Sequence, residues 1–193
     1  MKFELVIEAP QLARLNDIAA AHAERAAEWW GESLAAAHDL ISPADRRAAL
    51  AQLREERKLR RGTGEHFDTR SALVAFYVRA ELERRGWAGR SWRPVPPGEA
   101  ELPGRRWGVP NDGTRTADLS VSLPDEDGEL LRRATWHVSA PATRRLQQIA
   151  KMAGGLPRPV RDEQARLRGE VVTTADVIRA AVEAVLAAEH PTS

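Results

Sequence analysis

The sequence predicts a mainly α-helical fold with a short antiparallel β-ribbon, in which duplicated strand-helix-helix units form a pseudo-twofold dimer within one chain. Three observations predict it. Two segments recur in the same order in both halves, each half has a strand-like alternation followed by a proline, and each half ends in a helix with an apolar stripe.

The internal repeat consists of two matches. Residues 6–19, VIEAPQLARLNDIA, align with residues 137–150, HVSAPATRRLQQIA, with Ala-Pro, Arg-Leu and Ile-Ala in register. Residues 54–62 align with residues 161–169, and each of these segments precedes a strongly helical stretch. Two matches in the same order favour a duplication over chance similarity.

The first half begins with alternating apolar and polar residues at positions 2–8, the period of a half-buried strand. Pro10 suits the first turn of a helix, which we expect to run to about Glu28. An additional helix is predicted for residues 42–61, with Ser42 as its cap and Pro43 in its first turn. The later helix begins at Thr69 and ends before Gly86.

The second half repeats this order. Residues 135–140 are the predicted strand, Pro141 opens the next helix, and residues 154–155, two glycines, end it. The last helix begins at Thr173 and ends before Pro191. A second interpretation stays open, with the strand at residues 119–123 and two helices at residues 125–136 and 140–153.

The stretch between the halves is rich in proline, glycine, arginine and tryptophan, as in a linker or an irregular arm. We therefore divide the chain into a first repeat with a helical insertion, residues 1–86, an arm, residues 87–116, and a second repeat, residues 117–193. Trp92 and Trp107 lie in similar surroundings in the arm, and we expect them to pack against the body.

Composition narrows the class of protein. The chain has 193 residues, of which 42% are hydrophobic and 30% charged, enough for a globular core. It has no cysteine, which excludes disulfides and thiolate chemistry and fits a reducing cytoplasm. No apolar run predicts a membrane span or a signal peptide, so we expect a cytoplasmic protein without a membrane partner.

Charge is unevenly distributed although the net charge is only +1. Residues 1–41 contain three basic and seven acidic residues, whereas residues 132–168 contain nine basic and two acidic ones. Distribution matters more than the sum for binding a polyanion. Two segments, 54–61 and 161–168, interleave acids and bases as solvated helices do.

Three strings carry a resemblance to a known family: TRSALV at residues 69–74, TTADVIRAA at residues 173–181, and SVSLPDE at residues 120–126. A strand, a proline-initiated helix and a second helix of this kind resemble the ribbon-helix-helix family of DNA-binding proteins, in its tandem single-chain form. The match covers about half of the chain. It departs from the family because long insertions separate the two helices of each unit.

The resemblance implies sequence-specific binding of double-stranded DNA, with an antiparallel ribbon in the major groove and helix N-termini on phosphates. The implied base-reading residues are Lys2, Glu4, Val6, Arg133, Thr135 and His137. The implied phosphate-binding residues are Thr69, Arg70, Ser71, Thr173 and Thr174. A DNA-contacting arm would use Arg90, Arg93, Arg105 and Arg106. For the strands, an ordinary solvated face is the alternative, and the hydroxyl residues are helix caps first.

The resemblance also suggests a biological context: transcriptional repression, plasmid partition or conjugation, with a relaxase, a partition ATPase or a toxin as protein partner. One chain would act as a pseudo-dimer, with higher oligomers on DNA. The alternative function is a protein-protein adaptor, such as an antitoxin or assembly factor without direct DNA readout.

Catalytic motifs do not emerge from the sequence. The five histidines lack metalloprotease spacing, and there is no glycine-rich phosphate loop or serine elbow. Glu65, His66 and Asp68 are near one another, but a loop that enters a helix collects such residues for capping. We therefore expect a protein that is not an enzyme, with no cofactor and no metal.

Overall fold

A computed structural model describes residues 1–97, 113–152 and 157–189 of the chain. Among these residues, six helices make up 70% of the structure, and one two-stranded antiparallel sheet accompanies them. In chain order the elements are β1 (Lys2–Glu8), α1 (Ala9–His38), α2 (Pro43–Gly62), α3 (Arg70–Arg84), β2 (Arg115–Ser122), α4 (Asp125–Ala150), α5 (Arg158–Glu170) and α6 (Thr174–Ala188).

The ribbon pairs the start of the chain with its middle. Lys2 lies opposite Ser122 and Leu5 opposite Leu119, with an irregularity between Ile7 and Glu8. Alternation decides which face is buried, because successive side chains of a strand point to opposite sides. Four inner residues of the strands are at most 5% exposed and pack in one core with α3 and α6: Leu5, Ile7, Leu119 and Val121.

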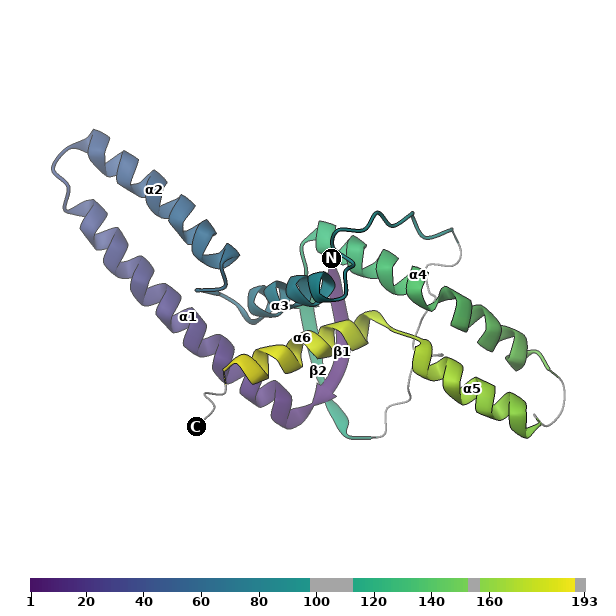
Figure 1. The fold of residues 1–193 in the computed structure, drawn as a ribbon. Coiled ribbons are helices and arrows are strands. Elements are labelled where there is room, and N and C mark those ends of the chain that lie inside the picture. Colours follow the sequence, from purple (N-terminus) through teal and green to yellow (C-terminus); the bar gives the residue numbers. More distant parts are fainter. Residues whose placement is uncertain (98–112, 153–156, 190–193) are drawn as a thin grey trace.

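Helices α3 and α6 pack against each other beneath the ribbon, and two helical hairpins extend from this centre on opposite sides (Figure 1). One hairpin is formed by α1 and α2, and the other by α4 and α5. We call these hairpins the α1–α2 arm and the α4–α5 arm. Both begin in the core, through Leu15 of α1 and Leu131 of α4.

The prediction of duplicated ribbon-helix-helix units forming a pseudo-twofold dimer is wrong. Each strand is followed by three helices, because α2 and α5 are complete helices within long hairpins rather than insertions in a turn. The aligned repeat also fails structurally, since residues 6–19 cross from strand to helix whereas residues 137–150 lie entirely inside α4.

The strand predicted at residues 135–140 is wrong for the same reason. Three acidic residues lie in the first turn of α4, where their negative charges interact favourably with the positive end of the helix dipole. Buried residues follow at helical spacing up to Ile149. This long helical period overrides a few alternating residues, and Pro141 is tolerated inside the helix. The alternative strand at residues 119–123 is confirmed by β2, although its two proposed helices are one.

The predicted start of α2 is confirmed, whereas the predicted end of the first helix is wrong. Ser42 caps α2 by accepting a hydrogen bond from the backbone N–H of Asp45, at 3.4 Å. Helix α1 continues ten residues beyond Glu28, to His38. A single Gly31 costs about 1 kcal/mol in a helix, and the alanines at 35–37 together with packing against α2 compensate for it.

Candidate nucleic-acid interface

The outer face of the ribbon is open to solvent. Lys2 and Glu4 are exposed and Val6 is half-buried, and across from them lie Ser122, Ser120 and Asp118. The Lys2 ammonium pairs with the Glu4 carboxylate at 2.8 Å. The first predicted strand therefore does present its polar side chains outward.

The charge of this face is negative. Two cations, Lys2 and Arg115, are accompanied by three carboxylates, those of Glu4, Glu8 and Asp118. Hydroxyl groups of Thr116 and the two serines complete the face. Such a surface offers hydrogen-bond donors and acceptors, but it does not attract a polyanion by charge alone.

The second set of predicted base-reading residues does not join the ribbon. Arg133, Thr135 and His137 lie on α4. The buried Thr135 hydroxyl donates to the Leu131 carbonyl at 2.8 Å, and Arg133 pairs with Glu129 at 3.2 Å. The side chains of Thr135 and Arg133 therefore bond to residues of their own helix. In a helix they do not share the single face that alternate residues of a strand would share.

His137 and the described part of the arm form one cluster. The His137 ring lies 3.0 Å from the Arg93 carbonyl and packs between Trp92 and Trp136. The guanidinium of Arg90 stacks on Trp92, which is half-buried against the core. The packing predicted for Trp92 is confirmed. Arg105, Arg106 and Trp107 lie outside the described residues.

The N-terminal turn of α3 meets an edge of the ribbon. Thr69 caps the helix by accepting from the Ala72 N–H at 3.1 Å, and Arg70 donates to the Asn16 side chain at 2.7 Å. The Ser71 hydroxyl accepts a hydrogen bond from the backbone N–H of Ser122 at 3.3 Å. The capping role predicted for this cluster is confirmed, and its phosphate contact stays a prediction.

The first two turns of α6 include a capped N-terminus and one contact with the other strand. Thr173 forms a capping box with Asp176, and Thr174 follows as the first helical residue. Arg179 donates to the Val6 carbonyl at 3.1 Å. Burial, and next the positive charge of Arg115, lower the pKa of the Arg179 guanidinium. Two arginines that the sequence analysis had not named, Arg115 and Arg179, thus lie close to each other near β1.

The base-reading residues predicted from the sequence did not include those of β2, although the sequence contains a signal for them. Thr116, Asp118 and Ser120 occupy the outer face of β2. Their signal is the alternation with Ala117, Leu119 and Val121. The approach of Arg115 to Arg179 has no such signal, because it joins residues from two distant elements.

An open groove of about 920 Å³ runs along α3. Its floor includes Ala72, Ala75 and Phe76, and it ends at Leu123 after β2. Arg79 closes one side through ion pairs with Asp127 and Glu83 at 2.7 and 3.2 Å. The groove is therefore apolar at its base, and the charge of Arg79 at its rim is balanced by two carboxylates.

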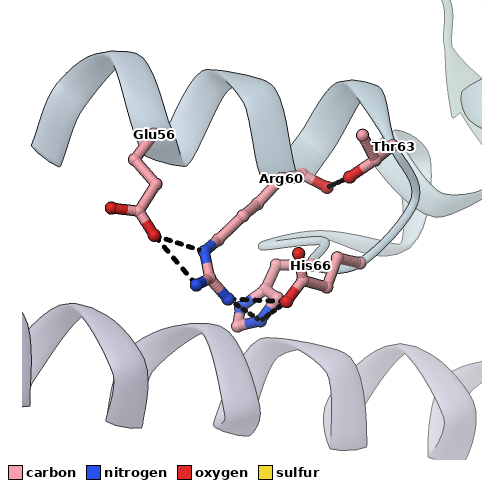
Figure 2. A network of polar contacts seen from close by, with 5 residues as sticks. Glu56, Arg60, Thr63 and His66 are labelled. Atoms are coloured by element: carbon pink, nitrogen blue, oxygen red, sulfur yellow. Dashed lines mark hydrogen bonds and ion pairs between the residues drawn. The ribbon is translucent and has the colours of Figure 1, made fainter. Parts of the chain in front are cut away.

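The α1–α2 arm is held by arginine and aromatic side chains. Arg60 lies over the ring of Trp29 and binds Glu56, Glu65 and His66. Figure 2 shows Arg60 with Glu56 on one side and His66 on the other. The Thr63 hydroxyl donates to the Arg60 carbonyl at 3.2 Å. This network ties the end of α2 to the loop that leads into α3.

The acidic residues of this loop are engaged in ion pairs. Glu65 binds Arg60 at 2.6 Å, and Asp68 binds Arg57 and Arg61. Within the described residues, no group of three side chains is arranged to hold a metal ion. In the same part of the chain, no helix has both the length and the apolar character needed to cross a membrane.

Comparisons of the chain with protein-family models, with curated proteins and with solved structures find no match. Functional inference therefore depends on the geometry of the ribbon, the helix N-termini and the arms.

Proposed function

We propose that this protein binds double-stranded DNA through the outer face of the ribbon. One observation supports the proposal above the others: the two-stranded ribbon packs one face on the core and leaves the other exposed. The major groove of B-DNA is about 12 Å wide and admits a two-stranded ribbon. The side chains on the outer face of such a ribbon are not needed to pack the core.

The outer side chains suit the edges of G·C base pairs. The Lys2 ammonium is able to donate to the O6 and N7 acceptors of guanine, and carboxylates such as Glu4 and Asp118 accept from the N4 amino group of cytosine. Thr116 and Ser120 serve as donors or acceptors. Sequence preference is therefore assigned to the ribbon.

Phosphate contacts are assigned to the edges of the ribbon. Ser71, in the N-terminal turn of α3, lies against β2, and Arg179, in the second turn of α6, lies against β1. A helix N-terminus favours an anion through its free N–H groups and dipole. Arg70 and Arg179 add charge there. Repression, plasmid partition and conjugation are the processes in which such binding would act.

The proposal is tested by selecting duplexes from a random pool and measuring their affinity by fluorescence anisotropy. We expect Lys2→Ala to reduce the preference for the selected duplex over a scrambled one by about 5- to 150-fold, which corresponds to about 1–3 kcal/mol. Lys151→Ala, which removes an exposed lysine at the end of α4, is the matched control. Failure of the wild-type protein to bind any duplex at low salt would refute the proposal.

A protein-protein adaptor is the second candidate, and the groove along α3 favours it. An apolar groove with a polar rim is typical of sites that take a helix or peptide. Ala75→Glu would place a charge on the groove floor and abolish retention of a protein partner while leaving DNA binding intact. Loss of DNA binding in this variant, with no partner recovered by the wild type, would argue against the adaptor.

A further inference from the structure

We infer that the outer face of α2 is a second DNA-contacting surface, which binds the phosphate backbone through Arg47, Arg54, Lys58 and Arg61. The inference rests on the proposed function and deepens it. The ribbon carries more carboxylates than cations, so most of the electrostatic affinity has to come from another surface. We call the four residues the basic stripe.

The basic stripe follows from the helical period. At 100° per residue, its four side chains fall within about 60° of one another around the axis of α2. They extend over about 21 Å along the helix, at about 1.5 Å per residue. All four are exposed, and Lys58 reaches 81%. The stripe is therefore continuous and open to a partner.

Two other arginines of α2, Arg57 and Arg60, lie about 70° and about 130° around the helix from the middle of the stripe, and both pack against α1. Arg57 lies 4.8 Å from the centre of the Trp30 ring, and Arg60 lies 4.6 Å from that of Trp29. These two arginines hold α2 to α1, since α2 has no fully buried residue. Arg57 and Arg60 thus pack against α1, whereas the four residues of the stripe are exposed.

Acidic residues do not neutralise the stripe. Glu56 is bound to Arg60, and Asp45 lies in the capped first turn. Glu55 approaches Lys58 only to 3.9 Å, with both side chains about 80% exposed, and such a pair is worth little.

Two arginines of the stripe stand apart from any acid. Arg61 alone has a close ion pair, with Asp68. Arg47 donates to the backbone carbonyl of Pro43, and Arg54 has no carboxylate partner among the described residues. The middle of the stripe is therefore a net positive surface.

A solvated helix of this protein looks different. On α5, four arginines are accompanied by three acidic residues, whereas α2 has seven cations and three acidic residues. Exposure alone therefore does not explain the composition of the stripe. Its length corresponds to about six phosphates along one DNA strand, at about 3.4 Å each.

The decisive experiment measures duplex affinity as a function of salt for two triple variants. Arg47→Gln/Arg54→Gln/Lys58→Gln removes three charges from the stripe, and Arg158→Gln/Arg161→Gln/Arg166→Gln removes three from α5. We expect the slope of log K against log salt to fall by about 2.7 in the first variant, at about 0.9 per phosphate contact, and by less than about 1 in the second. Affinity at moderate salt should fall at least about tenfold in the first variant only.

The outcomes separate this inference from the proposed function. An unchanged slope in the first variant, or equal losses in both, overturns the inference while wild-type binding still supports the ribbon. Wild-type protein that binds no duplex overturns both. Binding of the stripe to vesicles of anionic lipid, with no difference between wild type and variant on DNA, also overturns it. Circular dichroism checks that both variants keep their helical content, as expected for exposed substitutions.

Discussion

The two arms have the same element order but are stabilised in different ways. The α4–α5 arm has its own apolar cluster, formed by Ala142, Leu146, Ile149, Leu167 and Val171. In the α1–α2 arm, α2 has no fully buried residue, and arginines stack on tryptophans across the hairpin instead. Two helical hairpins can therefore reach the same shape through apolar burial or through cation–π and ionic contacts.

The surfaces of the arms differ in the same sense. The α4–α5 arm joins its helices by the Arg145–Glu163 ion pair, and α5 has four arginines and three acidic residues. On α2 the inner arginines are engaged and the outer cations exceed the nearby acids. In the α1–α2 arm only some of the charged residues hold the two helices together. The exposed cations of α2 are therefore available to bind a partner.

Truncation inside the apolar cluster should have the largest effect. Leu146 is fully buried, so Leu146→Ala is expected to lower the free energy of unfolding by about 2–5 kcal/mol. Leu53→Ala, at a half-buried position of α2, should cost about 1 kcal/mol, since little apolar area is lost there. Urea denaturation followed by circular dichroism measures both. Equal costs would mean that the two arms are stabilised alike.

Ser139 connects the α4–α5 arm to the start of α6. Its hydroxyl donates to the Val172 carbonyl and accepts from the Val172 N–H, both at 2.8 Å. Ser139→Ala should destabilise the protein by about 1–3 kcal/mol, because it leaves two backbone groups without a partner. Thermal denaturation provides the measurement. Ser139→Thr, which retains a hydroxyl, should recover part of the loss if the hydrogen bonds are responsible.

Arg60 tests the other arm. Arg60→Ala removes the stacking on Trp29 and the pairs with Glu56 and Glu65, and should cost about 1 kcal/mol. Hydrogen exchange should accelerate in α2 and remain unchanged in α5. Arg54→Ala, on the outer face, is the control and should leave exchange unaffected. Equal acceleration of exchange in both arms would contradict a role of Arg60 that is confined to the α1–α2 arm.

Acid should affect the α4–α5 arm by a small amount. A hydrogen bond from Arg145 holds the pKa of the Glu163 carboxyl below its usual value. Because the folded pKa is depressed, the contribution of this pair is complete above the usual glutamate pKa of about 4.3 and is lost as pH falls through the folded value. The protection factors of amides in α5, which correct for the intrinsic pH dependence of exchange, should therefore fall below about pH 4 in the wild type, and less so in Glu163→Gln.

Much of the fold could be predicted from local signals. The alternation at residues 2–8 indicated β1, Ser42 and Pro43 marked the start of α2, and Thr69 and Thr173 marked those of α3 and α6. These signals are local because a cap or a period is formed by neighbouring residues. The first choice of second strand was wrong because a short alternation was weighed without the long helical period around it.

Half of the proposed interface followed from the sequence, namely the outer face of β1 and the capped helix N-termini. The sequence by itself determined where most elements begin and which side of each strand is apolar, because these properties arise within a few residues. Tertiary structure alone decided that β1 pairs with residues 115–122, that Arg179 reaches the Val6 carbonyl, and which arginines of α2 stack on the tryptophans of α1. These contacts join residues far apart in the chain, so their geometry depends on how the core packs rather than on any local pattern.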